Sequence, residues 1–225
     1  MTRSPLAADA GQRIVGSGDL KARIAAQLAG TRPSATLEDW PLPEQSSDEL
    51  RRLRATLAAA PVPAAVLIPI VERESGLQVL LTRRASHMKY HGGQISFPGG
   101  RVEARDVDAV AAALRETHEE IGLESRFVEV VGFLPDHLIV TGYRVTPVVG
   151  FIRPGFDLAL DAREVVETFE VPLMHILDPA NRQARVRQFG DFSVPFQDIL
   201  FGSHVIWGAT AAMLISFGRI VAHDR

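Results

Sequence analysis

The sequence predicts a mixed α+β domain behind an N-terminal extension, in a chain of 225 residues. Short runs of β-branched and apolar residues between turn-forming residues indicate strands, and apolar residues that recur every three or four positions indicate helices. Because the two kinds of segment do not alternate regularly, the pattern favours an α+β or sandwich fold over a doubly wound parallel sheet. Hydrophobic residues make up 46% of the chain, which is enough for one sizeable core.

Residues 1–60 are expected to form the N-terminal extension and residues 61–225 the main domain. Within the extension, three apolar residues at helical spacing predict a short helix over residues 19–29: Leu20, Ile24 and Leu28. Residues 31–45 are rich in Pro, Ser and Thr and indicate a linker. A capping-box pattern that begins at Ser46 predicts a second helix.

The main domain begins with strands. Residues 62–71 and 77–82 flank a Glu-Ser-Gly turn and predict a β-hairpin. Further strands are expected at residues 95–97, 127–134, 145–152 and 185–189. Helices are expected at residues 107–121, 172–177 and 204–220.

The predicted helix 107–121 carries the most informative pattern in the chain. It follows the pair Gly99-Gly100 and ends in Arg-Glu-x-x-Glu-Glu before a glycine that can cap it. Helical geometry places three carboxylates on one side, namely Glu116, Glu119 and Glu120. The opposite side is expected to be the core-facing stripe, with Val110, Leu114, Thr117 and Ile121.

Like charges at this spacing destabilise a helix by about 0.2–0.5 kcal/mol per pair unless something neutralises them. Ligand sets made only of oxygen atoms favour Mg²⁺ or Mn²⁺. Beside a glycine loop that can approach phosphate closely, the carboxylates indicate metal-assisted chemistry on a phosphate ester or anhydride. The alternative interpretation is a solvated acidic face, which is common on surface helices.

A basic cluster precedes this segment, at the end of a predicted apolar strand. Its members are Arg83, Arg84, His87, Lys89 and His91. Cations at such a position are suited to phosphate groups. The alternative interpretation is an ordinary basic surface loop, and each histidine taken alone is better explained as structural or solvated.

The segment from Gly100 to Leu123 resembles the Nudix box. Two departures are present: Asp106 stands in place of the usual Glu, and the spacing from Asp106 to Arg115 is one residue longer than in the general pattern. The sequence Leu-Leu-Thr-Arg-Arg-Ala upstream, followed by Phe-Pro-Gly-Gly, resembles the signature of coenzyme A pyrophosphatases within this family, with Lys89 in place of the usual Arg. The resemblance implies an α/β/α sandwich with a mixed β-sheet.

The resemblance also implies roles for individual residues. Glu116, Glu119 and Glu120 would act as catalytic carboxylates and hold Mg²⁺ or Mn²⁺, together with the Gly100 carbonyl, and Arg115 would orient them. Residues implied in substrate binding are Arg83, Arg84, Lys89, Gln94, Phe97 and Gly99. Nudix enzymes often recruit a carboxylate outside the box, for which the candidates are Glu164 and Glu167.

The implied reaction is hydrolysis of the pyrophosphate bond of coenzyme A or its thioesters, which gives 3′,5′-ADP and 4′-phosphopantetheine or its acyl form. Two alternatives remain open. The box alone would also suit a pyrophosphatase for NADH, ADP-ribose or another nucleoside diphosphate derivative. A catalytically silent, nucleotide-sensing Nudix domain usually has damaged box carboxylates, whereas all three are present in this chain.

Composition limits the partners and the compartment that we expect. The net charge of −3 does not favour nucleic acid as a partner. The chain has no cysteine, which excludes disulfides and thiol nucleophiles, and it shows neither a signal-peptide core nor an apolar run long enough to span a bilayer. We therefore expect a cytoplasmic protein that binds a small-molecule substrate and no membrane; the family resemblance suggests a homodimer.

Overall fold

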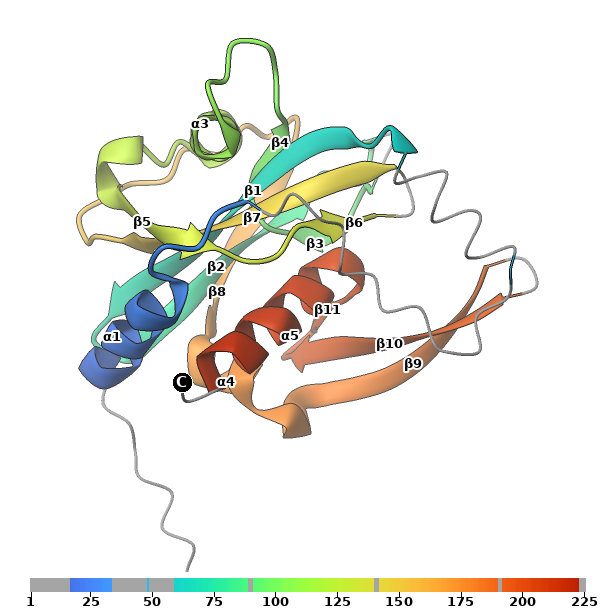
Figure 1. Cartoon of the computed structure of the whole chain (residues 1–225). Coiled ribbons are helices and arrows are strands. Elements are labelled where there is room, and N and C mark those ends of the chain that lie inside the picture. Colours follow the sequence, from blue (N-terminus) through green and yellow to red (C-terminus); the bar gives the residue numbers. More distant parts are fainter. Residues whose placement is uncertain are drawn as a thin grey trace, which may run out of the picture.

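A mixed β-sheet separates two layers of helices (Figure 1). The computed structural model describes residues 17–33, 48, 59–88, 91–139, 142–189 and 192–222. The sheet contains eight of the described strands, and five of them follow the order β3-β2-β1-β7-β5. Helix α3 covers one face, while α1 and α5 lie on the other, which confirms the predicted α+β class and its α/β/α layers.

The strands of this sheet have the following bounds: β1 (Val62–Arg73), β2 (Gly76–Arg84), β3 (Ile95–Ser96), β4 (Gly99–Arg101), β5 (Val128–Phe133), β6 (His137–Leu138), β7 (Tyr143–Ile152) and β8 (Val165–Pro172). β1 and β2 form the predicted hairpin, with Arg73 opposite Gly76. The central strand β1 pairs in parallel with β7 and antiparallel with β2 and β4. The sheet is therefore mixed.

The central strand is apolar along most of its length because both of its faces are covered. Ala65 and Leu67 belong to the core beneath α3 (Ala109–Ile121). Ala64 and Ile68 point to the opposite core, which α1 (Ser17–Leu28) and α5 (Gly208–Ala222) cover.

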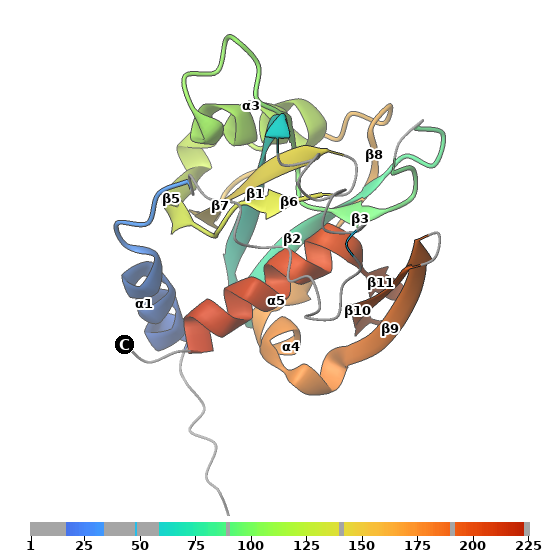
Figure 2. The ribbon, with the colours of Figure 1, turned by 45° about the vertical axis from the view of Figure 1, so that its right-hand side comes forward.

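A smaller antiparallel sheet lies against α5 on the side away from the main sheet (Figure 2). It consists of β9 (Arg182–Phe189), β10 (Phe192–Phe201) and β11 (His204–Ile206), in the order β11-β10-β9. Ile199 of β10 and Ile206 of β11 are fully buried in the core with α5. A short helix, α4 (Leu173–Leu177), leads from β8 towards this sheet through a turn of 3-10 helix, η2 (Pro179–Asn181).

Helix α1 is part of the main core. Leu20, Ile24 and Leu28, which predicted this helix, are all buried there. The segment after α1 is fixed to β5, since the Thr31 hydroxyl accepts a hydrogen bond of 2.8 Å from the Phe133 backbone N–H. The second predicted helix, which begins at Ser46, and most of the predicted linker lie outside the described residues.

One predicted segment was wrong in part, and two strands were not predicted. Residues 204–206 form a strand rather than the start of the last helix, which begins at Gly208. β8 was not predicted, since its segment drew attention only for the acidic residues Glu164 and Glu167, yet it pairs with β2 along the sheet edge. β10 was also missed; Pro195 interrupts its pattern, and proline is tolerated in strands mainly near edges and irregular positions.

The expected core stripe of α3 faces the core: Thr117 and Ile121 are buried, and Val110 and Leu114 are partly buried against the same cluster. The buried side is wider than predicted, because Ala112, Ala113 and Glu120 are buried as well. The small alanines allow the helix to lie close to the sheet. The buried side of the helix therefore extends to Glu120, while Leu114 packs at the margin of the core and also lines the outer groove.

Among the described helices, none has both the length and the apolar character needed to cross a bilayer.

Candidate active site

The candidate site lies where the last turns of α3 meet β4 and the end of β2. α3 starts at Asp108, whose side chain caps the Ala111 N–H, and it ends at Gly122 in the left-handed conformation with φ of 72°. These two caps define the helix that presents the carboxylates. Its second half contacts β4, so that Glu116 and Glu120 lie beside Gly99 and Gly100.

Glu120 is almost completely buried, with 2% of its side chain exposed. Its Oε1 accepts a hydrogen bond from Arg84 Nη1 at 3.0 Å, and its Oε2 accepts one from the Gly99 backbone N–H at 3.2 Å. The carboxylate from the box helix and the guanidinium from the upstream basic segment therefore meet in one ion pair.

The two glycines before α3 are needed for different reasons. Gly99 has φ of +151°, and a Cβ there would lie 2.4 Å from the Ala65 carbonyl oxygen. At Gly100 a Cβ would lie 2.4 Å from the carboxyl carbon of Glu116. Gly99 is therefore required by the backbone, whereas Gly100 leaves room for a carboxylate.

Arg115 connects the acidic groups on the outer side of the site. Its Nε and Nη2 donate to the two carboxylate oxygens of Asp106, each at 2.9 Å. Its Nη1 donates to Glu116 Oε1 and to Glu119 Oε2, also at 2.9 Å. The guanidinium lowers the pKa of Asp106 to about 2, and these carboxylates in turn raise the pKa of Arg115. Arg115 therefore stays charged and fixed.

Burial makes negative charge costly at the two inner carboxylates. It raises the pKa of Glu120 to about 7, although Arg84 and the Gly99 N–H act in the opposite direction. Burial also raises the pKa of Glu116, against the effect of Arg115. Repulsion from neighbouring carboxylates adds to this cost: Glu119 and Glu164 raise the pKa of Glu116, and Glu164 and Glu116 raise that of Glu120. The site would gain stability from an additional cation.

The donor set fits a hard divalent cation, because every candidate ligand is an oxygen atom and Gly100 allows the Glu116 carboxylate to lie directly against the backbone of β4. In the part of the chain that the structure describes, no three acidic, histidine or cysteine side chains are gathered as a metal-binding group. Arginines hold the carboxylates instead: Arg84 contacts Glu120, and Arg115 contacts Glu116 and Glu119. Binding of a metal ion would require some of these ion pairs to exchange.

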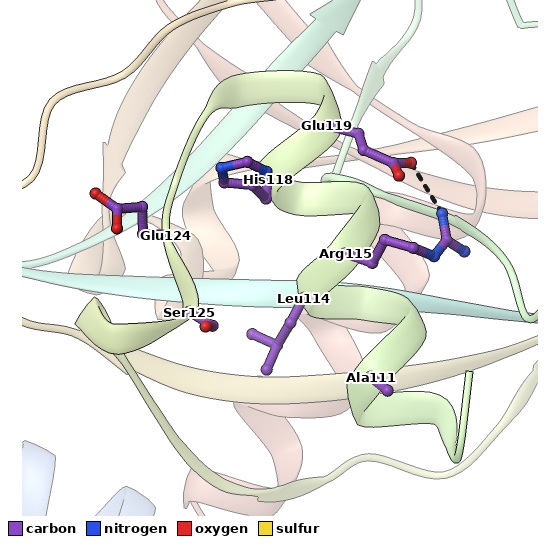
Figure 3. Close-up of a pocket in the computed structure, with 7 residues that line it drawn as sticks. All are labelled: Ala111, Leu114, Arg115, His118, Glu119, Glu124 and Ser125. Atoms are coloured by element: carbon purple, nitrogen blue, oxygen red, sulfur yellow. Dashed lines mark hydrogen bonds and ion pairs between the residues drawn. The ribbon is translucent and has the colours of Figure 1, made fainter. Parts of the chain in front are cut away.

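Glu119 points towards the outer surface of α3 and is 48% exposed (Figure 3). It contacts Arg115 and Arg105 rather than the Arg84–Glu120 pair. An open groove of about 460 Å³ runs along this surface, lined by Ala111, Leu114, Arg115, His118, Glu119, Glu124 and Ser125. Of the three predicted carboxylates, the structure thus brings Glu116 and Glu120 to the inner side of the helix and leaves Glu119 on the outer side.

The two adjacent arginines of β2 lie on opposite faces of the sheet. The pairing of β2 with β8 is irregular between Arg83 and Arg84, so that Arg83 lies opposite Glu167 and Arg84 opposite Val165. Arg83 forms an ion pair with Glu167, which His204 also contacts at 3.4 Å. Arg84 instead faces α3. Only the second arginine therefore reaches the box carboxylates.

The two candidate extra carboxylates pair with different arginines. Glu164 Oε2 lies 3.9 Å from Arg84 Nη2, and Glu164 is 46% exposed. Glu167 is held on the other face by Arg83. Glu164 is therefore the carboxylate outside the box that belongs to this site.

The remaining predicted substrate-binding residues lie in different surroundings. Gly99 contacts Glu120 directly. Gln94 is paired with His91 Nδ1 at 3.0 Å, and its carbonyl accepts a bond from the Arg84 N–H. Phe97 is buried in the core, with 2% exposed. Lys89 lies outside the described residues.

Sequence reasoning did not identify the role of Asp106, whose side chain is 4% exposed and holds Arg115 on two bonds. The available signal was that an acidic residue stands at this place before the box arginine in the Nudix pattern. Arg101 was also missed; its carbonyl accepts a bond of 3.1 Å from Arg115 Nη2. Nothing in the sequence distinguishes a backbone acceptor of this kind.

Comparison with known proteins places these features in one family. A family model described as NUDIX domain matches residues 61–192. A relative from Enterobacter sp. (strain 638) with the name uncharacterized Nudix hydrolase NudL is 41% identical over 178 residues, which are 76% of this chain and 84% of the relative. A protein of the same name from Escherichia coli (strain K12) is 42% identical over 153 residues, which are 67% of this chain and 78% of the relative.

Solved structures with a similar course of the chain are more distant. The MutT protein from Methanosarcina mazei Go1 has a TM-score of 0.45 and 21% identity, over 71% of this chain and 91% of that one. A MutT/nudix family protein from Enterococcus faecalis has a TM-score of 0.43 and 16% identity, over 79% of this chain and 63% of that one.

Proposed function

The chain belongs to the Nudix hydrolase family, and from that premise we propose that it hydrolyses the pyrophosphate bond of coenzyme A or its thioesters. The products would be 3′,5′-ADP and 4′-phosphopantetheine or its acyl form. Nudix hydrolases in general use divalent metal ions, and we propose Mg²⁺ or Mn²⁺ for this chain. The observation that carries the proposal is the Arg84–Glu120 ion pair, because it joins the upstream coenzyme A-like segment to the box carboxylates.

Glu116 and Glu120 are the proposed inner metal ligands, together with the carbonyl of Gly100. When bound, the metal ion would polarise the phosphoryl oxygens, lower the pKa of a bound water and stabilise the leaving phosphate. Glu119 is the third proposed ligand, and its side chain has to leave Arg105 and Arg115 to reach the other two. Arg115 keeps Glu116 in position through its bidentate bond to Asp106.

A carboxylate must accept the proton of the attacking water. Glu164 suits this task, since it is exposed and lies beside the Arg84–Glu120 pair without a box function of its own. Glu119 and Glu120 are the alternatives within the box. Glu120 is the weaker of the two candidates, because its carboxylate would already bind the metal ion.

The substrate assignment depends on the upstream segment. Coenzyme A carries a 3′-phosphate and a pyrophosphate, and both require cations along their path. Among the proposed contacts, Arg84 and Gly99 lie at the carboxylates. Arg83 lies on the opposite face of the sheet from Arg84. Gln94 lies in the loop that joins β2 to β3. Lys89 and Phe97 complete the proposed set, Phe97 from within the core.

We further propose that residues 1–60 form an extension of the hydrolase domain at residues 61–225. The protein would act in the cytoplasm as a homodimer. The substrate would be a small molecule, with no nucleic acid or membrane partner.

Product analysis would test the proposed function. The purified protein is incubated with coenzyme A, NADH or ADP-ribose, each with Mg²⁺ or Mn²⁺, and the products are separated by chromatography. Metal-dependent release of 3′,5′-ADP from coenzyme A, well above turnover of the other two, is expected. Preferential turnover of NADH or ADP-ribose would refute the coenzyme A assignment, and no turnover of any compound would favour a nucleotide-sensing domain.

A further inference from the structure

We propose that Arg84 is the resident counter-ion of Glu120 and competes with the metal ion for this carboxylate. Arg84 would act as a positioning residue that leaves Glu120 when a divalent cation binds and turns towards Glu164 and the substrate phosphates. The inference rests on the proposed metal-dependent function and adds a role for Arg84: its guanidinium would give up Glu120 to the cation and would remain available to the substrate phosphates.

The first argument is the occupancy of Glu120. Each of its oxygens accepts one hydrogen bond, from Arg84 Nη1 at one oxygen and from the Gly99 N–H at the other. The backbone donor is fixed by the pairing of β4 with β1. Arg84 is therefore the partner that a cation can replace at this carboxylate.

The second argument is charge. A guanidinium 3.0 Å from Glu120 and a divalent cation on the same carboxylate repel each other, and the burial of Glu120 reduces the screening of this repulsion by water. Every metal ion that binds Glu120 therefore does so against the positive charge of Arg84, unless the side chain moves away.

The third argument is that a second position for the guanidinium exists nearby. Glu164 Oε2 lies 3.9 Å from Arg84 Nη2, beyond an ordinary hydrogen bond but within reach of a small rotation. The backbone of Arg84 is held on both sides, since its N–H donates to the Gln94 carbonyl at 3.0 Å and its carbonyl accepts from the Gly93 N–H at 3.1 Å. The exchange thus requires movement of the side chain alone.

Arg83 provides a matched control. It is the adjacent residue on the same strand and carries the same charge, but it pairs with Glu167 on the opposite face. A general effect of net charge on metal binding would appear equally in Arg83 and Arg84 variants. An effect that arises at Glu120 would appear for Arg84 alone.

The test is calorimetric titration of the full-length protein with Mg²⁺ alone, without substrate, for the wild type, Arg84→Gln, Arg84→Lys and Arg83→Gln. A pH of about 9 lies about two units above the pKa of about 7 of Glu120, so that competition from protons is small. We expect Arg84→Gln to bind Mg²⁺ about tenfold more tightly than the wild type. Arg83→Gln should match the wild type, and Arg84→Lys should lie close to it because a cation is retained.

Equal or weaker Mg²⁺ binding by Arg84→Gln would overturn the inference while leaving the proposed function intact. Absence of Mg²⁺ binding by the wild type would overturn both. A second measurement needs no variant: the guanidinium resonance of Arg84 in NMR spectra of the wild type should move when Mg²⁺ is added, while that of Arg83 stays in place. An Arg84 resonance that does not move would also refute the exchange.

Discussion

Replacement of Gly100 by Ala should damage the active site with little effect on the fold. The added Cβ would lie 2.4 Å from the carboxyl carbon of Glu116 and 2.6 Å from both of its oxygens. An ordinary contact begins at 3.4 Å, so the carboxyl group has to move by at least 1.0 Å, the difference between 3.4 and 2.4 Å. The nearest atoms belong to the end of a flexible side chain, which can move without disturbing the backbone.

A displacement of about 1 Å at a catalytic centre can reduce the rate about 100-fold. This factor corresponds to about 2.7 kcal/mol of lost transition-state stabilisation. We therefore expect kcat/KM for coenzyme A with Mg²⁺ to fall about 100-fold in Gly100→Ala. Thermal unfolding of the metal-free protein should change by only a few degrees.

Two other glycines serve as controls for the same substitution. Gly18→Ala introduces a Cβ with no neighbouring atom within 4 Å and should leave both activity and unfolding unchanged. Gly99→Ala places the Cβ 2.4 Å from the Ala65 carbonyl oxygen at a positive φ, so it should destabilise the fold itself. A folded Gly100→Ala protein with activity close to that of the wild type would refute the assigned position of Glu116 as a requirement for catalysis.

Further predictions concern charge and packing. Because burial raises the pKa of Glu120 from 4.5 to about 7, the folded state retains a proton that the unfolded chain releases, and metal-free stability should fall as pH rises through that window. Glu120→Gln should lower kcat about a thousandfold. In urea unfolding, its free energy of unfolding should not show the decrease from pH 5 to pH 8 that the wild type shows; an equal decrease in both proteins would contradict the burial effect. In the coenzyme A hydrolysis assay, Glu164→Gln should lower kcat about 100-fold, whereas Glu167→Gln should hardly change it. A larger loss of kcat in Glu167→Gln would contradict Glu164 as the proton acceptor. Ile24→Ala should cost about 2–5 kcal/mol in chemical unfolding with kcat unchanged, whereas unchanged stability would mean that α1 contributes nothing to the core.

Most of the fold followed from apolar periodicity, because burial on one or two faces leaves a regular trace in the sequence. The hairpin of β1 and β2 and the helices α1 and α3 are examples. β8 is the instructive failure: it lies at the edge of the sheet, and its partly exposed, acidic side chains give no clear alternation. An edge strand is recognised only from the strand that it pairs with, which a single sequence does not reveal.

The same distinction holds for the site. The type and spacing of the carboxylates were visible in the sequence, but their depth was not. Burial of Glu120 depends on Ala112 and Ala113, which bring α3 close to the sheet and turn the carboxylate inwards. Likewise, Arg83 and Arg84 appear as one basic pair in the sequence, and they separate only because β2 extends to Arg84, so that successive side chains point to opposite faces.

The two arginines of the site neutralise its acidic groups in different ways, and this difference bears on how a metal ion could enter. Arg115 binds both oxygens of Asp106, a residue with no proposed metal contact, so it stays in place whichever carboxylates bind the metal. Arg84 has one hydrogen bond to Glu120 and a second, longer ion pair to Glu164. A cation that takes Glu120 therefore displaces a single bond of Arg84 and leaves the guanidinium a partner. The carboxylates can thus be held in place before the metal arrives, and one of the two arginines can still give way to it.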